Sequence, residues 1–387
     1  MKANRRRRLW NRPLVGAVAL LATITACGSS SSTTTGNNSP IVVGVVMPYS
    51  GEESFYGQYA DNAWTLAEAK YGSTINGHPI QIVKADSKCE PTAAVTAVHD
   101  VLAQNPVAIM APACSADTLA MIPITTAAKV PLVSENLAQA VTQQNSSYVW
   151  VVQPNDGVTN QFFGQWMVQQ GFTKVGIIHD TTAYGQGNAA TIASALTAAG
   201  DPPVVNQSYA FSATDYSGQI LALKKASINA AYLEGYDLQV GNLIKQARSL
   251  GLTVPIFAPT SASDDTFLKA AGSAADGVTV VTSFLPAWSA DASAYASQIQ
   301  SQFNYAANED SAGIYEQAVT IIQGLKKAGG GATSDQLNTA ISGLSLSGLP
   351  EGQVSFKSDG EVANPLVLVV QWKGTTLTQV TTLSGHS

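Results

Sequence analysis

Val43-Gly44-Val45-Val46 precedes Tyr56-Gly57-Gln58, and the pattern returns as Val175-Gly176-Ile177-Ile178 before Tyr184-Gly185-Gln186. In both places a short apolar run predicts a buried strand, and an alanine-bearing helix follows the Tyr-Gly-Gln segment. Two alanine-rich units can share such a pattern by coincidence. The alternative is two similar lobes, each with a tyrosine at the carboxyl end of its first strand, where open α/β sheets bind ligands.

The alternation of short Val/Ile-rich runs with longer helical segments continues on both sides of these stretches. The predicted strands are Ile41–Met47, Ile80–Ala85, Val107–Ala111, Val130–Ser134, Val175–His179, Ala230–Leu233, Val254–Phe257 and Leu366–Trp372. The predicted helices are Gly57–Lys70, Thr92–Gln104, Thr118–Ala128, Asn188–Ala199, Gln219–Ala226, Leu238–Leu250 and Ala312–Lys327. Apolar strands alternating with helices indicate parallel sheets covered on both faces, the doubly wound α/β class.

Composition excludes several classes of protein. With 45% hydrophobic and 12% charged residues, the chain is too apolar for intrinsic disorder. Its 387 residues exceed the size at which single cores stop growing, about 250–300 residues. Residues 1–26 hold six basic side chains and no acid, which leaves 14 basic against 26 acidic groups in the remainder. Because the chain after residue 26 is this acidic, it repels phosphate backbones, and nucleic acid is excluded as a partner.

The N-terminus is a targeting segment. A basic head over residues 1–12 precedes the apolar run Leu14–Ile24, which is shorter than the roughly 20 residues of a membrane span. Residues 1–26 are therefore predicted to be a signal peptide. The run ends in Ile24-Thr25-Ala26-Cys27, which resembles a lipobox, so Cys27 is expected to be acylated and to become the mature N-terminus; the alternative is an ordinary signal with an incidental cysteine. Residues 27–40 form a Ser/Thr-rich tether.

Export places the body outside the cytoplasm. The expected location is the outer face of the cell membrane, held by the lipid anchor, or the periplasm. The run Arg6-Arg7-Arg8-Leu9-Trp10 also permits a twin-arginine export route. If Cys27 carries lipid, Cys89 and Cys114 remain, and an even remainder in an oxidising compartment predicts one disulfide.

Motifs for cofactor, metal or catalysis are weak or missing. Gly185–Ala190 matches a GxGxxA fingerprint, but the first glycine lies beyond the tight turn and no acid follows about 20 residues on. The four histidines lack metal-ligand spacing, and the chain has no GxSxG, GxxxxGK[ST] or HExxH motif. The sequence therefore predicts no cofactor, no metal site and no enzymatic activity.

Ser115 stands at a turn that joins a strand to a helix. The run Val107–Ala116 leads from a predicted strand through small residues to a helix that opens near Asp117. At a helix N-terminus, the Ser115 hydroxyl and free backbone N–H groups can bind a carboxylate or carbonyl oxygen. The alternative is that Ser115 merely caps the helix.

The order of these motifs resembles one family. Pro48-Tyr49-Ser50-Gly51, Asp86–Pro91, Pro112–Ser115, His179–Gly187 and the late turn Gly352–Gly360 are together similar to the leucine/isoleucine/valine-binding family, the type I periplasmic solute-binding proteins of branched-chain amino acid ABC importers. The likeness extends from about Ile41 to the end of the chain. The paired cysteines also fit the disulfide of its amino-acid-binding members.

The resemblance implies two Rossmann-like lobes joined by three crossings and closing on a ligand by a hinge. The N-terminal lobe is expected to comprise 41–154 and about 285–345, and the C-terminal lobe 155–284 and about 346–387. The crossings are then expected at these places: near Pro154-Asn155, near Ser283–Pro286 and within Leu344–Gln353.

The resemblance also implies a set of ligand contacts. Tyr56 takes the place of an aromatic that packs on the ligand, and Ser115 that of the serine that binds its carboxylate. Tyr184 and Tyr236 stand where ring contacts from the second lobe are expected.

Two positions depart from the pattern of amino-acid binders. In the segment Glu135-Asn136-Leu137-Ala138, Ala138 replaces a threonine whose hydroxyl faces the ligand carboxylate. Asn136 of the same segment is also expected to contact the ligand. Thr260 replaces the glutamate that faces the ligand ammonium. Because an uncompensated buried ammonium is costly, the expected ligand carries a carboxylate or carbonyl but no ammonium. The alternative is that another acid takes over the ammonium: Glu135, Asp237 or Asp264.

These features predict a membrane-anchored solute-binding lipoprotein without a catalytic step. It is expected to act as a monomer that captures a small organic ligand, of the amino acid, amide or aromatic acid type, and delivers it to the permease of an ABC importer. Its contact with the membrane is the lipid anchor only. The alternative function is a ligand sensor coupled to a receptor kinase or chemoreceptor.

Overall fold

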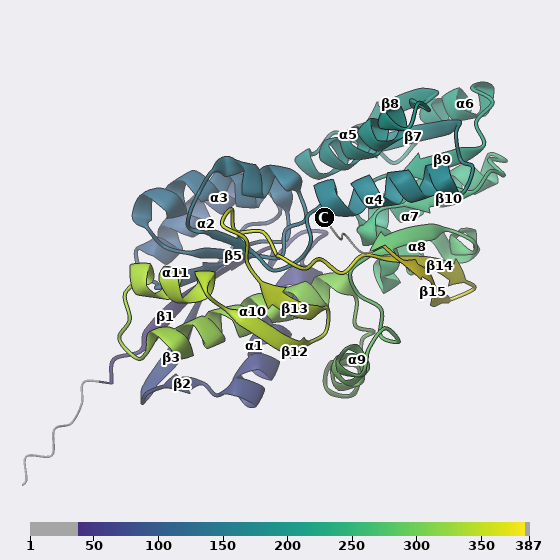
Figure 1. Ribbon diagram of the computed structural model, residues 1–387. Helices are drawn as coiled ribbons and strands as arrows, with labels where there is room; N and C mark the ends of the chain where they lie inside the picture. Colours follow the sequence, from purple (N-terminus) through teal and green to yellow (C-terminus); the bar gives the residue numbers. More distant parts are fainter. Residues whose placement is uncertain (1–37, 384–387) are drawn as a thin grey trace, which may run out of the picture. The chain divides into compact units, whose positions relative to one another are not determined.

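The computed structural model describes residues 38–383 (Figure 1). The predicted signal peptide, the predicted acylation site Cys27 and most of the predicted tether lie outside the described residues. Among those described, no helix combines the length and apolar character that a membrane crossing requires.

The first of the two large sheets has six strands in the order β2-β3-β1-β4-β5-β6. They are parallel except for β2, which pairs with β3 in the antiparallel sense. The strands are β1 (Ile41–Met47), β2 (Thr74–Ile75), β3 (His78–Asp86), β4 (Ala108–Met110), β5 (Leu132–Ser134) and β6 (Val149–Val151).

The second sheet has seven strands in the order β15-β14-β11-β10-β9-β7-β8. Strands β7 to β11 are parallel, whereas β14 and β15 are antiparallel additions at one edge. The strands are β7 (Val175–Asp180), β8 (Val205–Tyr209), β9 (Ala230–Leu233), β10 (Ile256–Ala258), β11 (Thr279–Thr282), β14 (Leu368–Lys373) and β15 (Thr376–Thr382).

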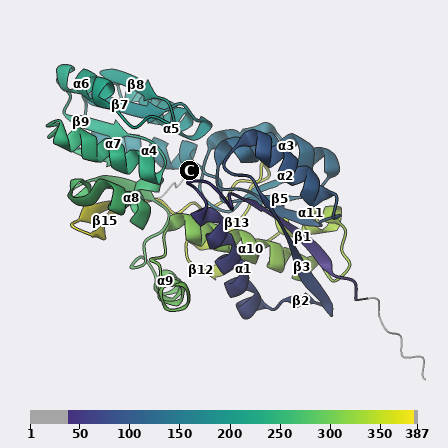
Figure 2. The ribbon, with the colours of Figure 1, turned by 180° about the vertical axis from the view of Figure 1, so that it is seen from behind.

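Helices cover both faces of each sheet (Figures 1 and 2). In the first lobe, α1 (Phe55–Tyr71) and α10 (Glu309–Ala328) pack on one face, and α2 (Pro91–Leu102) and α3 (Ser115–Ala128) on the other. In the second lobe, one face carries α6, α7 and α8 and the other α4 and α5. The second-lobe helices are α4 (Asp156–Gln169), α5 (Ala183–Ala198), α6 (Ser217–Lys225), α7 (Asp237–Ser249) and α8 (Asp265–Ala271). The predicted doubly wound α/β class is confirmed.

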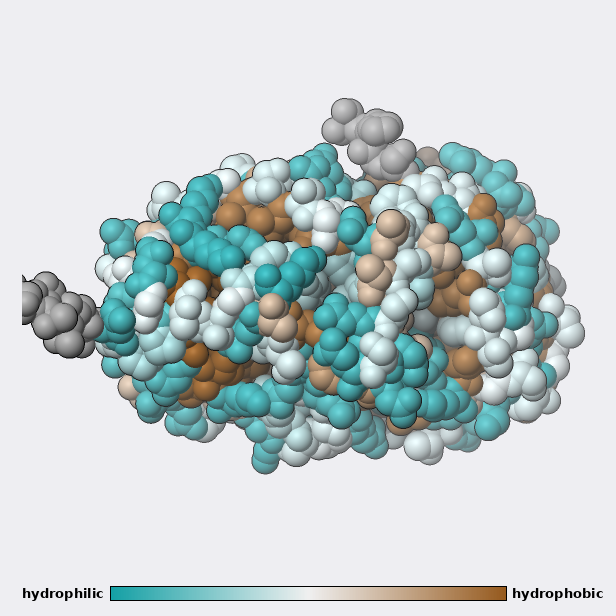
Figure 3. All heavy atoms as spheres, turned by 90° about the horizontal axis from the view of Figure 1, so that it is seen from below, coloured by the Kyte–Doolittle hydropathy of each residue, from teal (hydrophilic) through white to brown (hydrophobic). Residues whose placement is uncertain are grey.

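Late segments of the chain return to the first lobe. Helix α9 (Ala290–Phe303), helix α11 (Ser334–Ser342) and the hairpin β12 (Ser345–Leu349) and β13 (Gly352–Ser355) contribute side chains to the core that contains β1. On the outside, the face seen in Figure 3 is mostly hydrophilic, with apolar side chains in smaller separate groups. The apolar residues are thus concentrated between the sheets and their helices.

The repeated Val-Gly pair has a packing function in both lobes. A Cβ atom at Gly44 in β1 would overlap the side chain of Val101 in α2, and one at Gly176 in β7 would approach Leu223 Cγ in α6 to 2.9 Å. Glycine at the same position of the repeated motif therefore lets a helix lie close against the sheet in each lobe.

A disulfide joins Cys89, which precedes α2, to Cys114, which precedes α3, with their Cα atoms 5.5 Å apart. Closing a loop of 25 residues stabilises a fold by about 3 kcal/mol in the chain-entropy description. We expect Cys89→Ser/Cys114→Ser to lower the free energy of unfolding in urea by about that amount.

A reductant provides the control for this prediction. It should lower the stability of the unaltered protein to that of the double variant and leave the double variant unchanged. Equal stability of the two proteins without reductant would show that the exported protein lacks the bond.

Candidate functional site

A small cavity lies at the carboxyl ends of the parallel strands, with walls from both lobes. Its free volume is about 20 Å³, room for about one water molecule. Its lining residues are Tyr56, Ala113, Ser115, Glu135, Leu137, Tyr184, Tyr236, Ser261 and Asp310. Because an organic molecule needs far more space, the two lobes must separate to admit one.

A wider hollow of about 640 Å³ opens beside this cavity. Glu52 of the first lobe and Phe211 and Leu238 of the second are among its lining residues. The ring of Phe211 also packs on Tyr236 of the cavity, with centroids 5.4 Å apart. The ring of Phe211 therefore lies between the hollow and the cavity.

Four of the predicted ligand contacts line the cavity: Tyr56, Ser115, Tyr184 and Tyr236. The rings of Tyr184 and Tyr236 lie 5.0 Å apart and pack with Leu137 of the other lobe. The tyrosines of the repeated motif thus lie at the start of equivalent helices, α1 and α5, and on the same cavity. This placement favours two similar lobes over coincidence.

The other three predicted contacts do not line the cavity. Asn136 turns back into its own loop, where Nδ2 donates to the Ala113 carbonyl at 2.6 Å and Oδ1 accepts from the Ala138 amide at 3.0 Å. Ala138 packs in the apolar core beneath α3. Thr260 is buried at the start of a 3-10 turn, and its neighbour Ser261 lines the cavity instead. In the loop after β5, Glu135 and Leu137 reach the cavity in place of Asn136 and Ala138 because side chains alternate along an extended segment.

Ser115 is the first residue of α3, and Cys114 occupies the N-cap position without a side-chain hydrogen bond to the helix. The interpretation of Ser115 as a cap is therefore wrong, because the helix begins before Thr118, where it was expected. Ser115 is buried and hydrogen-bonds with Tyr236 of the second lobe, which partly offsets the rise in the Tyr236 pKa that burial causes. The amino end of α3 thus faces the cavity.

Three aspartates from different helices converge beside Tyr56. Carboxylate oxygens of Asp237, Asp264 and Asp310 lie within 4.8 Å of one another. Each belongs to the start of a helix: α7, α8 and α10, respectively. The partial positive charge of three helix N-termini stabilises the three acids at close range.

The hydrogen bonds of this aspartate group leave it incomplete. Asp264 accepts from the Phe267 amide at 2.7 Å and from Asn308 Nδ2 at 3.3 Å. Tyr56 donates its hydroxyl to Asp237 Oδ2 over 3.5 Å. The buried Asp237 Oδ1 has no hydrogen-bond partner in residues 38–383. Such an arrangement of oxygens can hold a positively charged group.

Burial raises the pKa values of these acids. It raises the pKa of Asp237 well above its usual range, and the charges of Asp264 and Asp310 raise that pKa further. Burial also raises the pKa of Asp264 to about 6, of Glu53 to about 7 and of Glu135 to about 8. A positive charge brought into the site would favour the ionised forms.

Part of this site is beyond sequence reasoning. Glu135, Asp237 and Asp264 stand among the alternatives that the sequence leaves open for an ammonium partner, but Asp310 and Glu53 do not. Asp310 lies 46 residues after Asp264 along the chain and meets it only because α8 and α10 begin at the same place. Its only local signal is an acid two residues before the predicted helix Ala312–Lys327, which in the structure begins at Glu309.

Comparison with known proteins agrees with the fold. Residues 40–376 match the family described as periplasmic binding protein. The leucine-, isoleucine-, valine-, threonine- and alanine-binding protein of Pseudomonas aeruginosa is 25% identical over 351 residues, which cover 88% of this chain and 92% of that protein.

Solved structures share the architecture. The branched-chain amino acid transporter substrate-binding protein of Streptococcus pneumoniae, in complex with isoleucine, superposes with a TM-score of 0.81 at 20% identity over 89% of this chain and 99% of that one. A solute-binding protein of an ABC transporter from Rhodopseudomonas palustris BisB5, in complex with 3,4-dihydroxybenzoic acid, gives a TM-score of 0.82 at 23% identity over 90% and 98%. At these identities the likeness establishes the fold and leaves the ligand of this chain open.

Proposed function

The chain belongs to the periplasmic binding protein family, and on that premise we propose that it closes its two lobes on a small organic molecule and delivers that molecule to the permease of an ABC importer. It is a solute-binding protein of the branched-chain amino acid transporter type and not an enzyme. The observation that carries the proposal is one cavity lined from both lobes, at the strand ends where such sheets bind ligands.

Closure would assemble the site from two halves. Tyr56 and Ser115 come from the first lobe, and Tyr184 and Tyr236 from the second. Aromatic rings on both sides give apolar contact area and ring stacking, while the amino end of α3 supplies polar groups. Neither half alone encloses a ligand, so binding and closure are coupled.

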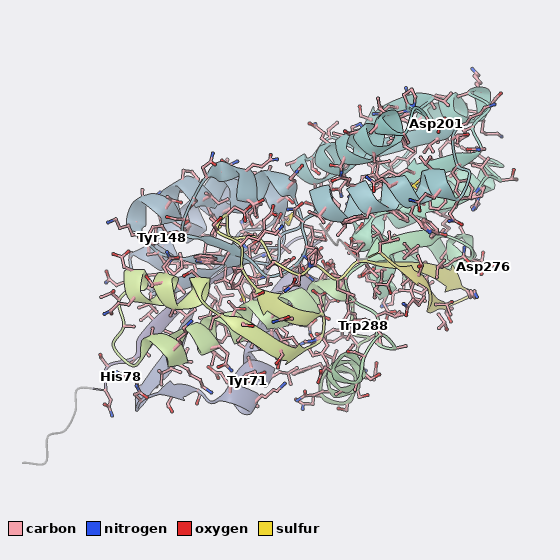
Figure 4. All side chains as sticks on the ribbon, viewed as in Figure 1. Tyr71, His78, Tyr148, Asp201, Asp276 and Trp288 are labelled. Atoms are coloured by element: carbon pink, nitrogen blue, oxygen red, sulfur yellow. A yellow bond between two sulfur atoms is a disulfide. The ribbon has the colours of Figure 1, made fainter. Side chains whose placement is uncertain are left out.

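The hinge comprises the segments that pass between the lobes. Two of them lie near Pro154-Asn155 and Ser283–Pro286, and Trp288 beside the second packs against both cores (Figure 4). For the third, the packing of Leu349 and Val354 with the first lobe and of Val367 with the second supports a position after Val354 in place of one within Leu344–Gln353.

A thermal-shift screen tests the binding function. A ligand at about 100 times its Kd raises the free energy of unfolding by about 2.7 kcal/mol, so an amino acid, amide, urea, aromatic acid or amine that binds should raise the melting temperature clearly. Uptake of the stabilising compound should then require both this protein and a permease. If no small molecule of these classes raises the melting temperature, the proposed function fails.

The lipid anchor is a second part of the proposal. Acylation needs the thiol of Cys27, so Cys27→Ser should lose lipid labelling and move from the membrane fraction to the soluble fraction. Ser29→Ala, a change of similar size in the adjoining tether, should leave both unchanged. Lipid labelling that persists in Cys27→Ser would show that the lipobox was misidentified.

A further inference from the structure

The cavity is lined by acids from one lobe and by no base. Glu135 and Asp310 both reach it, and Asp310 joins Asp237 and Asp264 in the aspartate group beside Tyr56. The buried polar residues of the described chain, 38–383, include no lysine, arginine or histidine. The two salt bridges of the described residues, Lys84–Asp61 and Lys357–Glu361, lie elsewhere, so these acids have no positive partner among residues 38–383 when they ionise.

Two buried carboxylate oxygens are unpaired: one belongs to Glu135 in the cavity lining, and one to Asp237, whose other oxygen accepts from the lining residue Tyr56. Glu135 is 2% exposed and Asp237 is 1% exposed, and neither Glu135 Oε1 nor Asp237 Oδ1 has a hydrogen-bond partner among the described residues. Buried acceptors of this kind are costly unless a donor reaches them. Glu135 follows β5 of the first lobe and Asp237 follows β9 of the second, so each lobe presents an acceptor that a ligand with N–H groups could satisfy.

The same arrangement disfavours a ligand carboxylate. Ser115 and the amino end of α3 are the groups that would bind it, but Glu135 lines the same small cavity. Once Glu135 is ionised, a ligand carboxylate there would meet a like charge at close range in a poorly solvated place. The tyrosine rings, in contrast, offer negative faces that attract a cation: Tyr56, Tyr184 and Tyr236.

We infer that the molecule bound by this protein is an organic cation without a free carboxylate, such as an amine, a diamine or a guanidine. The inference rests on the proposed function. It reverses the expectation, drawn from Thr260, that the ligand carries no ammonium. In the structure the acids lie at other positions, Glu135 and the aspartate group. The net negative charge of the body also draws cations toward the cleft.

Calorimetric titration of the exported protein tests this inference. The probes are a panel of primary amines, diamines and guanidines, including 1,4-diaminobutane and agmatine, with L-leucine, benzoate and calcium chloride as alternatives. At least one amine or guanidine should bind more tightly than leucine and benzoate. Its affinity should rise at least tenfold between about pH 6 and about pH 8, because the acids that receive it must be ionised.

Isosteric variants locate the cation. Glu135→Gln and Asp310→Asn should each weaken binding of the tightest amine about tenfold or more, since a charge-assisted hydrogen bond becomes a neutral one. Asp291→Asn, which removes the same charge from an exposed position of helix α9, is the matched control and should leave the affinity unchanged. Melting temperatures of all three variants show whether the fold is intact.

Each other result overturns the inference in a recognisable way. Tighter binding of leucine or benzoate than of every amine would overturn it while the binding function stands. Calcium binding that Asp237→Asn abolishes and Glu135→Gln leaves intact would indicate a metal site at the aspartates in place of an organic cation. No binding by any amine or guanidine would also overturn it, and no binding by any compound of the wider screen would remove the proposed function as well.

Discussion

Raising the pH from about 5 to about 8 should lower the free energy of unfolding of the body by several kcal/mol, about 1.4 kcal/mol per pH unit for each fully shifted acid. Burial raises the pKa of Glu316 to about 8 and of Glu135 to about 8, and it raises the pKa values of Glu309 and Glu351 well above their usual range. In the unfolded chain these acids ionise near pH 4.3.

The direction of this effect follows from proton binding. Between the unfolded and folded pKa values the folded protein holds more protons than the unfolded chain, so stability falls as pH rises. The stabilisation from these acids is fully present below their pKa in the unfolded chain, and it is lost as the pH rises toward their pKa in the folded protein. Most single domains show the opposite trend in the acid range, because their paired carboxylates have lowered pKa values.

Urea unfolding across this pH range measures the effect. Glu316→Gln should flatten the dependence, because one of the shifted acids is gone. Asp100→Asn, on the exposed side of α2, should leave it unchanged. A free energy of unfolding that stays level or rises between about pH 5 and about pH 8 would contradict the prediction.

These glutamates lie where the chain passes between the lobes. Gln153 Nε2 donates to Glu351 Oε1 at 2.8 Å, and the Ser283 hydroxyl donates to Glu351 Oε1 and Glu309 Oε1, each at 3.1 Å. The Glu351 amide donates to Glu316 Oε1 at 3.0 Å. Ionising several acids in this cluster would set like charges against one another, so the loss of stability should begin at the junction of the lobes.

The sequence predicted the central strands best. Strand β1 (Ile41–Met47) and strand β9 (Ala230–Leu233) have the predicted bounds, since buried parallel strands are continuous apolar runs. Edge strands such as β8 (Val205–Tyr209) and β15 (Thr376–Thr382) were missed because their side chains are largely polar and exposed. Their pairing comes from the neighbouring strand and not from their own pattern.

The site residues also include some that the sequence predicts and some that it does not. Tyr56 and Tyr184 could be predicted because the motif is local and occurs twice. Ser261 was missed by one position, since a 3-10 turn after β10 directs alternate side chains in a way that sequence does not reveal. The aspartate group was beyond prediction as a group, because its members come from three helices that only the tertiary fold brings together.

Tyr184→Ala should weaken binding of the tightest amine on the order of a hundredfold, a change of about 2.7 kcal/mol in binding free energy, and should lower the melting temperature little. Tyr184 belongs to a small cluster with Leu137, Tyr236 and Phe211 that lies apart from the main core of its lobe. The ring therefore contributes to closure and to the ligand more than to folding.

Tyr56 makes the instructive comparison, because its ring packs in the main core of the first lobe while its hydroxyl faces Asp237. Tyr56→Ala should therefore lower both affinity and melting temperature, whereas Tyr56→Phe should keep the fold and lose only the hydroxyl contact. Tyr295→Ala, in the same core but away from the cavity, should lower the melting temperature with little loss of affinity in the protein that remains folded. If Tyr184→Ala instead lost stability as heavily as Tyr295→Ala, the ring of Tyr184 would be a core residue, and the repeated motif would mark packing in both lobes with no ligand contact in the second.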